Sequence, residues 1–180
     1  RAYYRLVIAG LKRADHLIAN SEFTKRCIID VLRLAPERIT VIYPGLDHDL
    51  FRPQPVSDVI SERYQLAQGR RYLIYVGSED PRKNLTTLVR ALVDIRRVHP
   101  NVELIKVGRS HWESERLRLL DLAKQLHVED AIHFLELVPD ADLPLLYNLA
   151  ELYVTPSTEG FGFTVLEAMA CGTPVVCART

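Results

Sequence analysis

Hydrophobic residues occur along this chain in short runs that alternate with amphipathic segments. The runs are rich in β-branched and other apolar residues, and their lengths are typical of strands. They span residues 16–20, 39–45, 72–77, 102–108, 131–137, 152–157 and 174–178. Because the strands are apolar throughout rather than alternating, we expect both faces of their sheet to be covered by helices.

Between most of these runs the apolar positions follow helical spacing. Within residues 84–99, Leu85, Leu88 and Val89 belong to a pattern that recurs every three or four positions. This spacing predicts an amphipathic helix, with Asn84 as its N-cap. Three further helices are expected over residues 114–127, 140–151 and 163–172.

Strands that alternate with helices in this way predict βαβ units and a parallel sheet. The expected fold class is therefore α/β, a Rossmann-like parallel sheet flanked by helices. Residues 51–70 break the pattern with Pro53 and Pro55, so we interpret them as a linker with a short helix. Residues 71–180 then form one domain, and residues 1–50 are the tail of a preceding domain.

The two ends of the chain suggest a fragment of a longer protein. The chain begins with Arg1, and its only methionine is Met169. The last residues, 174–180, are expected to form a buried strand, and such a strand is normally followed by a further loop or helix.

Two residues are expected to cap predicted helices. Ser114 is the expected N-cap of the second predicted helix, and Gly172 is the expected C-cap of the last.

Composition narrows the class of protein. The 180 residues are 48% hydrophobic and 26% charged with zero net charge, which suits one soluble domain or one domain plus part of another. A general nucleic-acid binder would carry a basic excess. No apolar run reaches the roughly 18 residues that a membrane span needs, and no signal peptide is visible. The three cysteines lack metal-ligand spacing, which favours free thiols in a reducing compartment.

Two loops have a composition that suits an anionic ligand. Residues 77–84 follow one predicted strand and residues 157–164 follow another, and ligands of parallel sheets bind beyond such carboxyl ends. The first loop supplies Arg82 and Lys83 at a helix entrance, where phosphate is favoured. The second loop contains Gly162, which allows the backbone to approach a ligand closely.

Two glutamates, one in the second loop and one shortly after it, indicate that the ligand carries hydroxyl groups as well as phosphate. Glu159 lies before the glycines, and Glu167 lies eight positions later. Carboxylates repel phosphate, but they accept hydrogen bonds from two neighbouring hydroxyls, each worth about 1.5–3 kcal/mol. A ligand with phosphates in its middle and polyols at both ends fits this set. A nucleotide-sugar is such a ligand.

At these residues the sequence resembles a known enzyme class. "YVGSEDPRKNL" (75–85) is similar to a diphosphate-binding loop, and "LPLLYNLAELYVTPSTEGFGFTVLEAMACGTPVV" (143–176) to a donor-site segment with two spaced glutamates. Both resemble the C-terminal, donor-binding half of group-1 retaining glycosyltransferases of the two-domain GT-B fold. Residues 1–50 are similar to the end of the N-terminal, acceptor-side domain of that class.

The resemblance implies a role for each matching residue. Glu159 would lie by the transferred sugar, Glu167 would bind the ribose hydroxyls, and Lys83 would neutralise the departing diphosphate. The backbone segment that bonds sugar or phosphate oxygens would consist of Gly162, Phe163 and Thr164.

One position departs from the family pattern. Many members have a second basic residue directly after the strand glycine Gly77, where this chain has Ser78, and Arg82 is the candidate for supplying that charge. Gly77 and Arg109, each at the end of a predicted strand, are expected to line the donor cleft.

The implied reaction transfers a sugar, with retained anomeric configuration, from a UDP- or GDP-linked donor to an acceptor hydroxyl. Lys83 and Arg82 would take the part of a metal ion, so no metal and no further cofactor is expected. A missing domain would bind the acceptor, which could be a glycan, a lipid or a small molecule. The expected location is cytoplasmic, with peripheral membrane contact through that domain, and the chain alone is expected to be inactive.

Other interpretations stay open. An epimerase of similar fold would bind the same donor, and an inactive nucleotide-sugar-binding module would keep the same residues. A dinucleotide oxidoreductase would need three glycines in G-x-G-x-x-G after its first strand, but "GFGFTV" (160–165) has two. Three possible metal sites are less favoured than simpler interpretations: residues 47–49 suit a turn, residues 140–142 a helix cap, and His111 with Glu115 a solvated helix face. Trp112 is expected to be a packing residue.

Overall fold

A computed structural model describes residues 2–56, 58–110 and 113–179. Internal contacts divide the chain into two compact units, each of which is described by itself. Unit 1 comprises residues 1–45 together with 159–162, and unit 2 comprises residues 46–158 and 163–180.

Unit 1 is a small α/β arrangement built on two parallel strands, β1 and β2. Ser21 caps helix α2, because its side chain accepts a hydrogen bond from the Thr24 amide at 3.0 Å. Both strands were expected from the sequence, whereas the two helices of this unit were not. The elements are α1 (Ala2–Arg13), β1 (Leu17–Ala19), α2 (Glu22–Leu32), the 3₁₀ turn η1 (Pro36–Arg38) and β2 (Ile39–Val41).

Unit 2 is built on a five-stranded sheet in the order β5-β4-β3-β6-β7. Every neighbouring pair in this sheet is parallel, so the βαβ pattern of the sequence is confirmed. All five strands were predicted, although their ends differ by one or two residues. They are β3 (Arg71–Val76), β4 (Val102–Val107), β5 (Ile132–Leu135), β6 (Leu152–Thr155) and β7 (Val175–Cys177).

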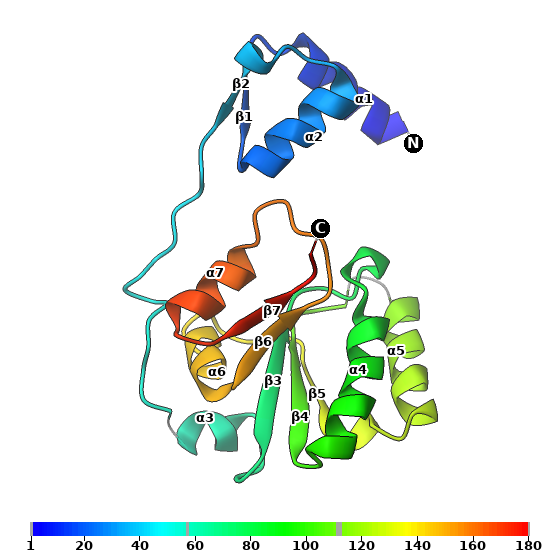
Figure 1. The fold of residues 1–180 in the computed structure, drawn as a ribbon, viewed down its shortest axis with the longest axis vertical. Helices are drawn as coiled ribbons and strands as arrows, with labels where there is room; N and C mark the ends of the chain where they lie inside the picture. Colours follow the sequence, from blue (N-terminus) through cyan, green and yellow to red (C-terminus); the bar gives the residue numbers. More distant parts are fainter. Residues whose placement is uncertain (1, 57, 111–112, 180) are drawn as a thin grey trace. The chain divides into compact units, whose positions relative to one another are not determined.

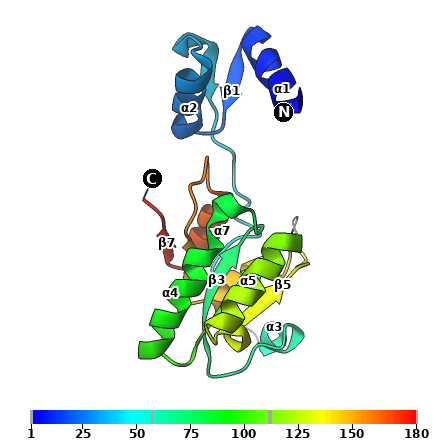
Figure 2. The ribbon, with the colours of Figure 1, turned by 90° about the vertical axis from the view of Figure 1, so that its right-hand side faces the viewer.

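Helices cover both faces of this sheet (Figure 1). Helices α4 and α5 lie side by side on one face, as Figure 2 shows, while α6 and α7 lie on the other. The elements of unit 2 outside the sheet are α3 (Asp58–Arg63), η2 (Pro81–Lys83), α4 (Leu85–Val98), α5 (Glu113–Gln125), η3 (Glu129–Ala131), α6 (Leu143–Leu149) and α7 (Phe163–Ala170).

The strand residues alternate between two hydrophobic cores. In β3, Tyr72 and Ile74 pack on the side of α6 and α7, whereas Leu73 and Tyr75 pack on the side of α4 and α5. All four side chains are buried. This confirms that both faces are covered, which explains why β3 has no polar face.

The structure corrects several local predictions. The strand at 174–178 is not buried in this chain: among the described residues β7 pairs with β6 alone, and Val176 is 53% exposed. Ser114 is not a cap, because α5 begins at Glu113. Asn84 precedes α4 as predicted but lies in the left-handed region (φ 52°) without a capping side-chain bond. Gly172 follows α7 with φ 81°, as a C-terminal glycine should.

Candidate functional site

Most of the predicted site residues follow the carboxyl ends of three neighbouring strands. Gly77 follows β3, Arg109 follows β4 after one glycine, and α7 follows β6 through the loop at 156–162. Because β4, β3 and β6 are adjacent in a parallel sheet, these carboxyl ends share one edge. This edge is where an open α/β sheet binds its ligands.

The loop after β3 begins with a glycine that the local geometry requires. Gly77 has φ 154°, and a Cβ there would lie 2.6 Å from the Tyr75 hydroxyl oxygen. That hydroxyl donates to the carbonyl oxygen of Ser78 at 3.0 Å. The tyrosine therefore occupies the space of a side chain at Gly77 and holds the next residue.

The two basic residues of this loop differ in their surroundings. The Arg82 side chain is 86% exposed and forms an ion pair with Asp80 at 3.0 Å, and this hydrogen bond from Arg82 lowers the pKa of the Asp80 carboxyl. Lys83 is half-buried at the end of η2, directly before α4. Because Arg82 is paired with Asp80 of its own loop, it is a weaker candidate for supplying the positive charge that is missing at Ser78.

Glu167 lies in the middle of α7 and is half-buried. The hydroxyl of the fully buried Tyr147, on α6, donates to Oε2 of Glu167 at 2.9 Å. Burial raises the pKa of Glu167, the bond from Tyr147 lowers it, and Asp140 raises it, with a net increase. A carboxylate has about four lone-pair positions, so this one can still accept from a pair of ribose hydroxyls.

The first turn of α7 carries two further predicted residues. Phe163 is 43% exposed. The Oγ1 of Thr164 shares a hydrogen bond of 2.7 Å with the hydroxyl of buried Tyr153, on β6. The side chain of Thr164 therefore ties α7 to the strand that precedes it, and its predicted ligand contact is through the backbone.

The loop that contains Glu159 and Gly162 belongs to unit 1. Gly162 has φ 84°, a left-handed conformation that favours glycine. The carbonyl oxygen of Gly160 accepts a hydrogen bond from the Ser21 hydroxyl at 2.5 Å. Lys83 and Glu167 belong to unit 2, so their grouping with Glu159 in one site stays a prediction from the sequence.

Two aspartates from the disfavoured metal sites bond to groups of the protein itself. Asp47 accepts from the amides of Asp49 and Leu50, as a turn residue does. Asp142 stands at the N-cap position of α6 but makes no capping bond, and it accepts instead from Arg63 at 2.6 Å and from the Tyr64 hydroxyl at 2.7 Å.

The described part of the chain contains no cluster of three or more His, Cys, Asp or Glu side chains that could hold a metal. His111 and Trp112 lie outside the described residues. Within the described residues, every helix is too short or too polar to cross a bilayer.

Sequence reasoning missed four residues near this edge of the sheet. Glu79, Lys106 and Arg116 form a buried ion cluster, and Tyr147 holds Glu167. The sequence did contain a signal for Lys106, because a charged residue inside a strand that is covered on both faces needs a partner. Nothing in the sequence names that partner.

Comparisons with known proteins agree with this architecture. The family model described as "Glycosyl transferases group 1" matches residues 56–180, and the one described as "Glycosyltransferase Family 4" matches residues 1–50. O-antigen chain mannosyltransferase B of Escherichia coli is 36% identical over 94% of this chain and 45% of its own length. The D-inositol 3-phosphate glycosyltransferase of Thermobispora bispora is 34% identical over 92% of this chain and 40% of its own length.

Solved structures of glycosyltransferases are similar as well. Sucrose-phosphate synthase of Thermosynechococcus elongatus is 29% identical, with a TM-score of 0.80 over 96% of this chain and 43% of that one. The Anabaena protein HepE, solved in complex with UDP and glucose, is 27% identical, with a TM-score of 0.84 over 98% of this chain and 48% of that one.

This chain spans less than half the length of these relatives. The group-1 model nevertheless covers the whole parallel sheet of unit 2, the loop that carries Lys83 and the helix that carries Glu167. The sheet order and the likeness to GT-B glycosyltransferases also confirm the fold class predicted from the sequence. The chain therefore belongs to the group-1 glycosyl transferase family.

Proposed function

We propose that this chain binds the donor in a retaining glycosyltransferase, which transfers a sugar from a nucleoside-diphosphate sugar to an acceptor hydroxyl. The observation that carries the proposal is the carboxylate of Glu167, half-buried on α7 and held by Tyr147 at 2.9 Å. A held carboxylate suits a ribose, because its oxygens can accept from two neighbouring hydroxyls. Lys83, on the loop after the adjacent strand β3, suits the diphosphate.

In the proposed reaction, a basic side chain and the N-terminal end of a helix stabilise the negative charge on the leaving diphosphate. As the sugar leaves the donor, negative charge develops on the diphosphate, and Lys83 stabilises it together with the N-terminal end of α4. Glu159 faces the sugar in this proposal. Arg82 assists only when it releases Asp80. The reaction proceeds without a metal ion, which product formation in excess EDTA would test.

A calorimetric titration tests the donor site directly. The chain is titrated with UDP, GDP, ADP and NAD, and UDP has priority because the HepE structure contains it. We expect one nucleoside diphosphate to bind, and Glu167→Ala to weaken it by about tenfold or more, since bonds to a charged acceptor are worth about 1.5–3 kcal/mol each. Glu151→Ala is the matched control, because Glu151 is an exposed carboxylate before β6, paired with Arg71.

Three outcomes would redirect the proposal. Binding of NAD in preference to every diphosphate would favour a dinucleotide oxidoreductase. Diphosphate binding that is indifferent to Glu167→Ala would remove the ribose contact. Interconversion of a UDP- or GDP-sugar without an acceptor would favour an epimerase.

Activity belongs to the complete protein in this proposal. The chain covers 45% and 40% of the two curated relatives named above, and this proposal assigns the acceptor site to the remaining part. We expect the chain alone to bind donor and transfer nothing, whereas the complete protein should form a product whose anomeric configuration, read by NMR, matches the donor. An inverted product would contradict retention, and transfer by the chain alone would show that it contains the acceptor site.

A further inference from the structure

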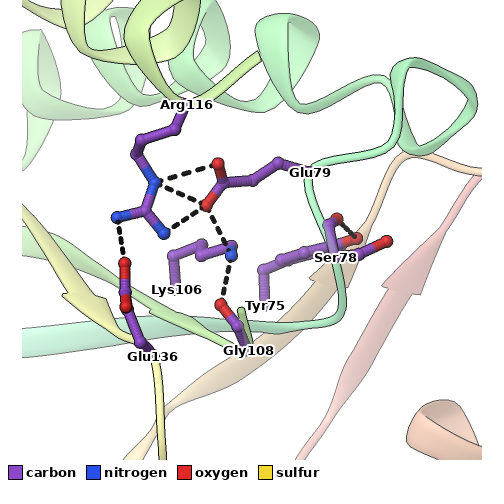
Figure 3. Close-up of polar contacts among 7 residues, drawn as sticks. All are labelled: Tyr75, Ser78, Glu79, Lys106, Gly108, Arg116 and Glu136. Atoms are coloured by element: carbon purple, nitrogen blue, oxygen red, sulfur yellow. Dashed lines mark hydrogen bonds and ion pairs between the residues drawn. The ribbon is translucent and has the colours of Figure 1, made fainter. Parts of the chain in front are cut away.

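Glu79 is a buried carboxylate in the middle of the loop that carries Lys83. Its side chain is fully buried, and Figure 3 shows its polar contacts. The Nζ of Lys106, on β4, lies 2.6 Å from Glu79 Oε1. The Nε of Arg116, on α5, donates to both carboxylate oxygens, at 2.7 and 2.9 Å. Two cations from two other elements therefore hold one residue of the β3–α4 loop.

The same cluster connects the carboxyl ends of three strands. Lys106 also donates to the carbonyl oxygen of Gly108, directly after β4, at 2.6 Å. Arg116 also pairs with Glu136, directly after β5, at 3.1 Å. With Glu79 after β3, the segments that leave β3, β4 and β5 are joined to one another and to α5 (Figure 3).

The backbone of this loop is also held at its beginning. The Tyr75 hydroxyl bonds the carbonyl oxygen of Ser78. A Cβ at Gly108 would lie only 2.8 Å from the carbonyl oxygen of Gly77, so the two strand-ending glycines are in close contact. The loop is thus held at residues 77, 78 and 79, and Asp80 then caps the 3₁₀ turn that ends at Lys83.

A cluster of this kind is poorly explained by stability alone. Burying ions carries a large desolvation cost, and buried ion pairs often stabilise a fold no more than apolar side chains of the same size would. A buried carboxylate that contacts two cations does resist displacement, because moving it would leave buried charges without a partner. In this protein that restraint acts on the loop after β3.

We propose that Glu79, held by Lys106 and Arg116, is a positioning residue that sets the path of residues 78–83 and so presents Lys83 to the diphosphate of the donor. This inference rests on the donor-binding function proposed above. It assigns the buried cluster to the phosphate side of the ligand and not to the ribose side. The base and the ribose should therefore be indifferent to it.

The charge state of Glu79 agrees with this role. Burial raises the pKa of the Glu79 carboxyl, but hydrogen bonds from Arg116 and Lys106, with their charges, outweigh burial and bring the pKa below its usual value. The carboxylate is therefore ionised at neutral pH. Glu79→Gln keeps the shape of the side chain and removes the charge that attracts both cations.

The test compares a nucleoside diphosphate with its monophosphate. For Glu79→Gln we expect the Kd for UDP to rise about tenfold, equivalent to 1.4 kcal/mol, while the Kd for UMP stays within about twofold. GDP and GMP are titrated in parallel. Lys106→Met should give the same pattern with a smaller change, because Arg116 still holds both oxygens of Glu79. An equal loss for diphosphate and monophosphate, or no loss, would overturn the inference.

Glu103→Gln is the matched control. Glu103 is a buried carboxylate near the opposite end of β4, paired with Arg70 at 3.0 Å and with His133 at 2.7 Å. Its replacement also removes a buried charge, but we expect both Kd values to be unchanged. If Glu103→Gln gave the same selective loss for UDP, the effect would be one of general stability.

A measurement without ligand separates this inference from the proposed function. Hydrogen exchange of the amides in residues 78–84 should become faster in Glu79→Gln and stay unchanged in Glu103→Gln. If the unmodified chain bound none of UDP, GDP and ADP, the proposed function would fail and the positioning role would fail with it. If the chain bound UDP but the loop amides of Glu79→Gln kept their wild-type exchange rates, only the positioning role would fail.

Discussion

The Tyr147 hydroxyl lowers the pKa of the neighbouring Glu167 carboxyl. The tyrosine is fully buried between the rings of Phe51 and Tyr153, so its hydroxyl has a fixed position and needs a partner. This hydroxyl donates a hydrogen bond to the Glu167 carboxylate at 2.9 Å. A donor to the ionised form favours that form, and the bond therefore lowers a pKa that burial raises.

Tyr147→Phe should change the pH dependence of nucleotide binding. Without the hydroxyl, the pKa of Glu167 rises further, so a larger fraction of the carboxyl is protonated in weakly acidic solution. A protonated carboxyl accepts fewer bonds from ribose, and we expect affinity for UDP to fall more at pH 5 than at pH 8. Calorimetric titration between these pH values measures the difference.

Tyr72→Phe is the control for that substitution. Tyr72, on β3, is buried in the same hydrophobic core, but its hydroxyl donates to the carbonyl oxygen of Ala67 at 2.9 Å. Tyr72→Phe loses a bond to a neutral carbonyl oxygen, worth about 0.5–1.5 kcal/mol of unfolding free energy, and Tyr147→Phe loses a bond to a carboxylate, worth about 1.5–3 kcal/mol. Only Tyr147→Phe should weaken UDP binding more strongly at acidic pH. If both variants had the same pH dependence of UDP affinity, the proposed effect of Tyr147 on Glu167 would be contradicted.

The loops after β3 and β4 depend on glycine at their closest approach. Gly108 has φ 116°, and a Cβ there would meet the carbonyl oxygen of Gly77 at 2.8 Å. Backbone atoms cannot give way as the end of a flexible side chain can. Strain at such a position costs on the order of 1–3 kcal/mol, and the clash adds to it.

Gly108→Ala should therefore lower the free energy of unfolding by about 2 kcal/mol or more. Gly10→Ala serves as the comparison, because Gly10 lies exposed in α1 with nothing within 4 Å of an added Cβ. That substitution should instead favour the helix by roughly 0.5–1 kcal/mol. Denaturant unfolding followed by circular dichroism gives both values, and a neutral Gly108→Ala would show that the two loops can separate.

The two units differ in how much apolar surface supports them. Unit 2 has a sheet with a hydrophobic core on each face. Unit 1 has one small core, formed by Leu17, Ala19, Leu32, Leu34 and Ile39. Several large apolar side chains of α1, including Tyr3, Tyr4 and Leu6, are mostly exposed. In this chain, unit 1 therefore has less buried apolar surface to stabilise it than unit 2.

Hydrogen exchange should show this difference within the chain. Amides of β1 and β2 should exchange at least about tenfold faster than those of β3 and β4, because local opening follows the density of buried contacts. Mass spectrometry of the exchanged chain, with peptides from each strand, makes the measurement. Equal protection of the strands in both units would mean that the chain opens as a single cooperative unit.

The fold class, the family and the loops that carry the candidate site could all be predicted from the sequence. Strand and helix periodicities are local properties, so all the strands and the helices of unit 2 appeared near their predicted positions. The glycine at 172 was identified for the same reason, since a helix end that requires positive φ favours one residue type. The roles of Lys83, Glu159 and Glu167 come from a motif and await the titrations.

The pairing of distant side chains, by contrast, depends on the folded chain. Tyr147 and Glu167 are 20 positions apart, and Glu79 and Arg116 are 37 apart, so no local pattern connects either pair. The exposure of β7 and the pairing of Asp142 with Arg63 likewise depend on strand order and on packing between distant elements. Apolar burial is non-directional and can be predicted from pattern, whereas a buried charge needs one particular partner, which only the tertiary structure specifies.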